Sequence, residues 1–325
     1  MKLGILGTGM IVKDLLPTLK KLPIEGISIL STEASRKAAE QLAAAYDLDK
    51  TYCDYDALLA GDVDAIYVAL PNFLHYSFAK KALAHGKHVI IEKPVTANAA
   101  ELADLIETAK PRGLMIFEAM NIHYLPSFQA LKKDLAKLGQ IKVVSFNYSQ
   151  YSSRYDAFKA GVILPAFDCH KAGGALMDIN VYNVHAILGL FGVPQAARYH
   201  ANVEKGIDTS GMMFYDYGGF KAVSIGAKDC KAPIRSTIQG DLAAIVIEKP
   251  VNQMTEYRIL YNDGRGELRT FDQKEHRLFY EFAAFLRMIE ENAVEEQQKA
   301  LALSLEIAKL MQKTRTAEGI VFDND

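Results

Sequence analysis

One lysine of this 325-residue chain stands where it could move a proton or stabilise negative charge. It is Lys93, which together with Glu92 ends the apolar run 88–91, a predicted buried strand that Pro94 stops. Open α/β sheets bind ligands at the carboxyl ends of their strands. An ammonium group there can bond to a substrate hydroxyl and stabilise developing alkoxide charge. The position alone fits equally well a solvated Glu92–Lys93 pair with only a structural role.

A carboxylate, a phenol and an imidazole occur at helical spacing after a pair of glycines. Asp178 and Tyr182 are four residues apart and His185 follows three later, so they share one face of the predicted helix 175–190. A phenol beside an ammonium group is a suitable proton donor or acceptor for an alcohol and its ketone. The alternative is a core tyrosine bonded to a buried aspartate. For His185 we favour an inner histidine whose hydrogen bonds are satisfied.

The start of the chain predicts a dinucleotide-binding turn. Gly7-Thr8-Gly9-Met10-Ile11 follows the apolar strand 3–6 directly and opens a helix. Gly7 permits the tight turn, Gly9 lets the backbone approach a pyrophosphate, and the helix N-terminus supplies N–H donors and partial positive charge. Val12 replaces the third small residue of the fingerprint, which serves helix packing. Because the motif alone is weak evidence, a glycine turn in an unrelated α/β domain is the alternative.

The end of the second strand bears on the choice between NAD and NADP. A carboxylate there accepts hydrogen bonds from the ribose 2′-OH and repels a 2′-phosphate. The strand 27–30 ends in Ser31 and Thr32 with no acid at its tip, and Arg36 is close by. We therefore favour NADP over NAD, although Glu33 could turn inward. The alternative is that Arg36 belongs to a solvated first helical turn.

Further residues follow the later strands and form a rim at the same edge of the predicted sheet. Asn72, just after the strand 65–70, either caps the next helix or touches the cofactor. His75 lies within a turn of it, and Glu118 and Asn121 end the strand that follows. The predicted cofactor-binding residues are Gly7, Thr8, Gly9, Met10, Ile11, Ser31, Thr32, Arg36, Leu70, Asn72, His75, Glu92, Lys93 and Asn121.

Two kinds of pattern divide the chain into two domains. Up to about residue 120, short apolar runs alternate with helical patterns, which predicts a doubly wound parallel sheet of Rossmann type. Beyond it, consecutive strand patterns over 141–151 and 197–271 predict an α/β domain with one large, open, mainly antiparallel sheet. A last helix, 278–313, is expected to break near Asn292. We place the domains at 1–120 and 121–325.

Composition excludes several classes of function. Lys and Arg number 37 and Asp and Glu 39, so no basic surface for nucleic acid is expected. No apolar run approaches the length of a membrane span. Cys53, Cys169 and Cys230 have neither zinc spacing nor disulfide spacing, which fits a reducing cytoplasm. No metal-ligand spacing and no Gly-x-Ser-x-Gly motif occur. His170 is either a substrate contact or part of a surface loop.

Taken together, these motifs resemble the Gfo/Idh/MocA family of nicotinamide-dependent oxidoreductases, over nearly the whole chain. The resemblance is carried by Gly7–Ile11, Asp64–Asn72 with His75, Gly86–Pro94, Gly173–Asp178 with Tyr182, and Ala317–Ile320. It implies a Rossmann domain followed by an α/β domain whose open sheet often forms a subunit interface. We therefore expect a homo-oligomer through the C-terminal sheet.

The resemblance also implies roles for individual residues. Lys93 is then the central catalytic base or acid, and Asp178 orients the substrate or Lys93. Tyr182 stands where many members have His, as in members similar to glucose–fructose oxidoreductase and dimeric dihydrodiol dehydrogenase, in which the tyrosine is the proton donor. Asn180 replaces a common glycine and could alter the shape of the pocket. The peptide bond before Pro94 is expected to be cis.

These inferences predict hydride transfer between NADP(H) or NAD(H) and a secondary alcohol or ketone of a sugar, polyol or cyclic diol. One alternative is a nucleotide-sensing regulator on the same fold that lacks catalysis and binds a protein. The retention of Lys93, Asp178 and Tyr182 argues against it. A Rossmann methyltransferase is a weaker alternative, because it gives no reason for Lys93.

Overall fold

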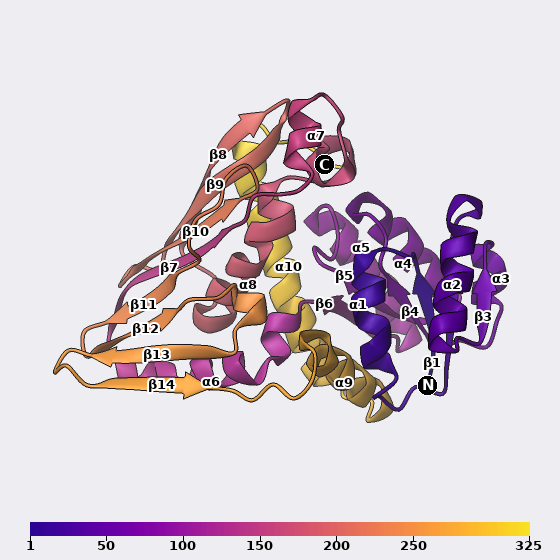
Figure 1. The fold of residues 1–325 in the computed structure, drawn as a ribbon, viewed down its shortest axis with the longest axis horizontal. Coiled ribbons are helices and arrows are strands. Elements are labelled where there is room, and N and C mark those ends of the chain that lie inside the picture. The colour runs from indigo at the N-terminus through magenta and orange to yellow at the C-terminus, as the bar shows by residue number, and fades with distance from the viewer. The chain divides into compact units, whose positions relative to one another are not determined.

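The computed structural model describes residues 1–325, which divide into two compact units. The first unit comprises Met1–Ala119 and Leu278–Leu305 and is built on a six-stranded parallel sheet (Figure 1). The order of its strands is β3-β2-β1-β4-β5-β6. They are β1 (Lys2–Leu6), β2 (Gly26–Leu30), β3 (Lys50–Tyr52), β4 (Ala65–Val68), β5 (His88–Glu92) and β6 (Ile116–Ala119). The predicted doubly wound parallel sheet is confirmed.

The strand order reverses between β1 and β4, and this reversal creates the ligand-binding edge of the sheet. The chain runs from β1 outward to β3 and then returns to β4 on the other side of β1. The connections leaving the carboxyl ends of β1 and β4 therefore diverge and leave room for a dinucleotide. The helices of these connections are α1 (Met10–Leu19), α2 (Arg36–Tyr46), α3 (Tyr55–Leu59), α4 (His75–Ala84) and α5 (Ala99–Ala109).

The last helical stretch consists of two helices, α9 (Arg277–Glu290) and α10 (Val294–Ala317). The break falls at the predicted place, where Asn292 has a φ of 49°. In α9, Phe282 packs edge-on against Tyr67 of β4, and Phe285 lies 4.7 Å from the ring of Phe117. These aromatic contacts explain why Leu278–Leu305 cluster with the first unit. The domain limits 1–120 and 121–325, drawn from sequence pattern alone, remain a prediction.

The second unit comprises Met120–Arg277 and Glu306–Asp325. Its eight-stranded sheet has the order β14-β13-β12-β11-β7-β10-β9-β8, and all neighbours are antiparallel except β7 and β10. The strands are β7 (Ile141–Ser149), β8 (Ala196–Glu204), β9 (Ile207–Asp216), β10 (Lys221–Ala227), β11 (Ser236–Gly240), β12 (Ala243–Ile247), β13 (Glu256–Tyr261) and β14 (Gly266–Thr270). Its α-helices before α10 are α6 (Pro126–Asp134), α7 (Tyr155–Lys159) and α8 (Val181–Phe191).

The two faces of this sheet differ in their surroundings. Alternate residues such as Val144, Phe146 and Ile259 are fully buried, and α8 packs against β7 and β10. The residues between them point to the other face, where apolar side chains remain exposed. These include Val143, Met212, Phe214, Leu260 and Leu268, each 44–59% exposed. We call these five residues the open-face patch. No helix in the structure has the length and apolar character needed to cross a membrane.

Candidate active site

The turn after β1 has the geometry that a pyrophosphate requires. Gly7 has a φ of +105°, and a Cβ atom there would lie 2.7 Å from the carbonyl oxygen of Ala69. Gly9 is the N-cap of α1, no side chain caps this helix, and no atom lies within 4 Å of the place a Cβ would take. The structure therefore leaves backbone approach open and presents the first N–H groups of α1. Val12 is fully buried in the packing behind them.

The end of β2 presents hydroxyl groups and one ion pair. Ser31 is buried and lies beside Cys53, and Thr32 forms a capping box with Ser35. The guanidinium of Arg36 donates to both carboxylate oxygens of Glu33, at 2.5 and 3.0 Å. This bond with Arg36 lowers the pKa of the Glu33 carboxyl. Both side chains are exposed, so Arg36 can exchange Glu33 for another anion.

Lys93 projects from a turn whose backbone is held by buried side chains. Glu92, at the end of β5, is buried and accepts a hydrogen bond of 2.5 Å from the hydroxyl of Tyr67 on β4. Its other carboxylate oxygen accepts from the backbone N–H of Lys93, at 3.3 Å. On the far side of Pro94, the N–H of Val95 donates to the buried Glu118 at the end of β6. The Lys93–Pro94 bond is cis, as expected.

The imidazole of His75 contacts the backbone of this turn. It is fully buried, and its ring nitrogens lie 3.0 Å from the carbonyl oxygen of Pro94 and 2.8 Å from that of Leu70. Burial lowers the pKa of the imidazole. Both ring nitrogens face protein carbonyls, and a cofactor contact of His75 stays a prediction. The histidine links the ends of β4 and β5.

Three further residues of the predicted rim are Leu70, Asn72 and Asn121. Leu70 and Asn72 are partly exposed after β4, and Leu74 rather than Asn72 is the N-cap of α4. The capping alternative for Asn72 is therefore excluded, and its cofactor contact stays a prediction. Asn121 belongs to the second unit, where its buried amide donates to the carbonyl of Asn252.

Asp178 lies in a π-helix, Leu176–Asn180, that leads into α8. Such wide turns occur frequently at functional sites. The carboxylate of Asp178 is 39% exposed and pairs at 2.8 Å with the ammonium of Lys228, which is only 2% exposed. The sequence analysis missed Lys228; the available signal was a lysine directly after an apolar strand. The alternative of a buried aspartate is thus excluded.

Tyr182 lies at the start of α8, partly buried against a small apolar cluster. Its ring is 6.0 Å from that of Tyr148 at the end of β7, and Ile179 and Ile234 belong to the same cluster. Asn180 is fully buried and packs against Gly226 of β10, where a Cβ would lie 2.5 Å away. The expectation that Asn180 shapes a pocket is corrected, since it fills the interface between helix and sheet.

The two histidines considered beside this helix are engaged elsewhere. His185 is buried, and its Nδ1 lies 3.1 Å from the Nε2 of His123. This environment is the one expected for an inner histidine with satisfied hydrogen bonds. His170 is exposed, and its Nδ1 pairs with Asp323 at 2.7 Å, which raises the pKa of the imidazole. A substrate contact from His170 stays a prediction.

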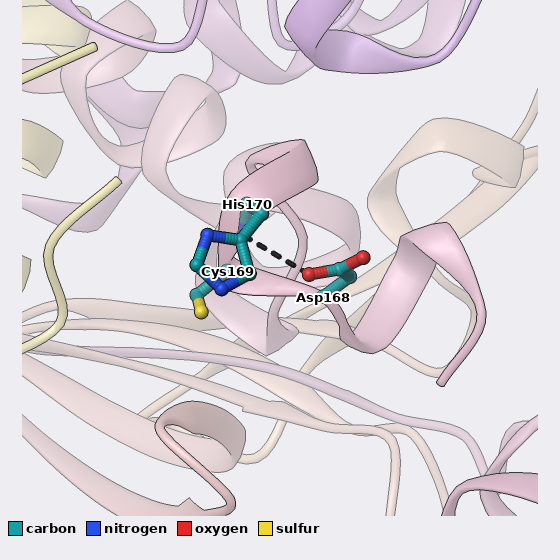
Figure 2. A group of neighbouring side chains, drawn as sticks. All are labelled: Asp168, Cys169 and His170. Carbon is teal, nitrogen blue, oxygen red and sulfur yellow. Dashed lines mark hydrogen bonds between the residues drawn. The ribbon is translucent and has the colours of Figure 1, made fainter. Parts of the chain in front are cut away.

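Asp168, Cys169 and His170 bring three metal-ligand types together in one short turn (Figure 2). The Asp168 carboxylate accepts from the backbone N–H of His170 and faces the ammonium of Lys171 at 3.4 Å. The Nδ1 of His170 also pairs with Asp323, so two of the three side chains already have charged partners in the protein.

The comparisons with known proteins agree with this geometry. Residues 1–120 match the family model for an oxidoreductase family with an NAD-binding Rossmann fold, GFO_IDH_MocA. The chain is 34% identical, over its full length and 99% of the relative, to the scyllo-inositol 2-dehydrogenase (NADP(+)) IolU of Bacillus subtilis. The chain belongs to the Gfo/Idh/MocA family of oxidoreductases. It is 29% identical, over 99% of its length and the whole relative, to a D-xylose 1-dehydrogenase (NADP(+)) of Haloferax volcanii.

Solved structures of low sequence identity share the fold of this Gfo/Idh/MocA member. KijD10, a 3-ketoreductase from Actinomadura kijaniata, superposes with a TM-score of 0.82 at 22% identity and 97% coverage of both chains. A levoglucosan dehydrogenase superposes with a TM-score of 0.83 at 17% identity, covering 98% of this chain and 97% of the other. The fold of the chain is therefore that of these two solved structures over nearly its whole length.

The bond from Tyr67 to Glu92 gives a test of the Lys93 turn. Tyr67→Phe removes the hydroxyl that donates to the buried carboxylate of Glu92. We therefore expect the free energy of unfolding to fall by about 1.5–3 kcal/mol. Turnover should fall as well, because the turn loosens. Tyr55→Phe, which removes a hydroxyl bonded to the carbonyl of Phe78, is the matched control and should leave turnover intact. Urea unfolding and initial rates measure both; equal turnover in the two variants would contradict a role for this bond.

Proposed function

We propose that this oxidoreductase transfers a hydride between NADP(H) and a secondary alcohol or ketone of a sugar, polyol or cyclic diol. The observation that carries the proposal is Lys93, placed after β5 at the carboxyl edge of the parallel sheet on a turn fixed by Glu92, Glu118 and His75. The relatives named as dehydrogenases of inositol and xylose support the alcohol chemistry. They give no support to the regulator alternative.

A bound nicotinamide would accept or supply the hydride at its ring, and this chain's residues would manage the substrate oxygen. In the oxidative direction the hydride leaves the carbon and the hydroxyl proton passes either to the uncharged amine of Lys93 or to Tyr182 in its phenolate form. In the second case the ammonium of Lys93 stabilises the negative charge that develops on the oxygen. Asp178, acting as a hydrogen-bond acceptor, orients the substrate. Each of these side chains is at least partly accessible.

Two features support NADP as the cofactor. The tip of β2 carries hydroxyls at Ser31 and Thr32 and no acid, and the flexible Arg36 side chain can reach a phosphate once it leaves Glu33. The named relatives from Bacillus subtilis and Haloferax volcanii are NADP(+) enzymes. We propose a cyclic polyol such as scyllo-inositol as the first substrate to try, since that relative matches the chain from end to end.

Lys93→Met tests the catalytic proposal. Since methionine cannot transfer a proton or supply positive charge, we expect kcat to fall by about 10²–10⁴-fold on any substrate that the wild type accepts. NADPH binding, followed by fluorescence, should survive. Lys87→Met, which removes a lysine just before β5, is the control at the other end of the same strand. Unchanged turnover of the Lys93 variant across a panel of sugars, inositols and diols would reject the role.

The pair of Arg36 and Glu33 tests the cofactor preference. Arg36→Ala should weaken NADP binding by about tenfold or more and leave NAD binding nearly unchanged. Glu33→Gln removes the competing carboxylate and should tighten NADP binding. Titration of both variants with both nucleotides gives the answer. An Arg36→Ala variant that keeps its NADP affinity would contradict a phosphate contact.

We also propose that the open-face patch pairs with a second copy of the chain. Large apolar groups at this exposure on a flat sheet face are typical of subunit interfaces. Met212→Glu should therefore lower the mass measured by light scattering to that of a monomer. Leu242→Glu, at a still more exposed apolar position in the turn between β11 and β12, is the control. A monomeric wild-type chain would refute this proposal.

The free thiols of Cys53, Cys169 and Cys230 support a reducing location, and we propose the cytoplasm.

A further inference from the structure

We propose that Lys228 is a positioning residue for the reaction: its buried ammonium fixes the carboxylate of Asp178 in the orientation that receives the substrate. The inference rests on the proposed role of Asp178 and concerns only residues of the second unit. Four observations carry it: a fixed backbone, a buried cation with three partners, a half-exposed carboxylate, and a rigid helix start.

The backbone of Lys228 is fixed from both sides. It follows β10, which lies between β9 and β7 in the sheet. Its N–H donates to the carbonyl of Thr209 at 2.9 Å, and its own carbonyl accepts from the N–H of Ser152 at 2.8 Å. The side chain therefore starts from a point that does not move with the loops around it.

The ammonium of Lys228 has a complete set of partners inside the protein. It lies 2.8 Å from the Oδ2 of Asp178, donates to the carbonyl of Ala166 at 2.5 Å, and stands 4.2 Å above the ring of Phe167. The lysine side chain is 2% exposed, whereas that of Asp178 is 39% exposed. A substrate could therefore reach the carboxylate but not the ammonium, so Lys228 acts through Asp178.

The helix that bears Asp178 is anchored independently at its start. The carboxylate of Asp208 accepts from the N–H of Leu176 at 2.6 Å and from the hydroxyl of Tyr199 at 2.7 Å. Burial raises the pKa of Asp208, and the charge of Lys228 acts in the opposite direction. Asp208 thus fixes the backbone of the π-helix, while Lys228 holds the side chain of Asp178. An ionised carboxylate accepts hydrogen bonds and does not donate one.

Stability alone gives no reason for a charge at this position. Taking an ammonium group out of water is costly, and apolar residues of similar volume often replace buried ion pairs without loss of stability. A methionine would fill most of the space of the lysine stem. The pair with Asp178 therefore points to a requirement for charge and direction at the carboxylate.

The experiment is a double-mutant cycle on the full chain, with Lys228→Met, Asp178→Asn and both together, assayed with NADPH or NADP and the best substrate of the panel. Misplacement of a substrate-orienting group costs up to about 10²-fold, so Lys228→Met should lower kcat/KM by roughly 10–100-fold. In the Asp178→Asn background the same change should have almost no further effect. Independent losses that multiply would show a role in packing alone and overturn the proposal.

Two further variants separate charge from packing. Lys228→Arg keeps the charge and should recover most of the activity lost in Lys228→Met, although methionine matches the lysine stem better. Lys205→Met is the matched control, because Lys205 also donates to a backbone carbonyl and stands over a phenylalanine ring, at Phe158, but does not pair with Asp178. It should retain wild-type turnover. If Lys228→Met does not fold, Lys228→Gln takes its place in the cycle.

The outcomes distinguish this inference from the proposed function. Wild-type turnover in Asp178→Asn would remove the role of Asp178 and the inference with it, while the Lys93 result would still stand. A large loss in Asp178→Asn with wild-type kinetics in Lys228→Met would overturn the inference alone. Binding of NADPH should be unchanged in every variant, because the dinucleotide turn belongs to the first unit.

Discussion

The chemistry that we propose for this oxidoreductase depends on one cationic side chain, Lys93, whose backbone is held by hydrogen bonds to buried carboxylates. Glu92 is the key group, since one carboxylate oxygen accepts from Tyr67 and the other from the N–H of Lys93. A buried carboxylate with these donors costs less than one without them, and removing a donor would expose that cost. The hydrogen bonds of Glu92 therefore tie the turn that bears Lys93 to the ends of β4 and β5.

In the second unit the residues of interest lie on a helix rather than on a turn after a strand. Here the residues for which we propose a function, Asp178 and Tyr182, lie at the start of a helix, where backbone N–H groups lack partners within the helix. Asp208 satisfies the N–H of Leu176, and a lysine from the neighbouring strand β10 engages Asp178. In both units a buried charged residue bonds to a residue for which we propose a function: Glu92 to the backbone N–H of Lys93, and Lys228 to the carboxylate of Asp178.

Local pattern was enough to predict most of the architecture. Continuous apolar runs indicated the parallel strands, alternation indicated the second sheet, and the break at Asn292 followed from the interrupted helical pattern. The position of Lys93 at a strand end followed from Pro94. Spacing alone left Tyr182 open to two interpretations, a proton donor or a core tyrosine. The resemblance to the family favoured the proton donor.

What escaped prediction depends on contacts between residues far apart in the sequence. Lys228 and Asp178 are 50 residues apart, so no periodicity relates them. The ring nitrogens of His75 face the carbonyl oxygens of Leu70 and Pro94, which only the folded turn brings together. Phe282 of α9 packs against Tyr67, more than 200 residues earlier in the chain, and this contact places α9 in the first unit. Sequence pattern could not reveal such a contact.

The central claim is that the amine of Lys93 meets the reacting oxygen of the substrate. A crystal structure of the chain with NADP and a substrate that it turns over tests this most directly. We expect the Lys93 nitrogen within hydrogen-bond reach, about 2.6–3.2 Å, of the hydroxyl on the carbon facing the nicotinamide. A complex in which this amine points into bulk water, away from the ring and the substrate, would contradict the account.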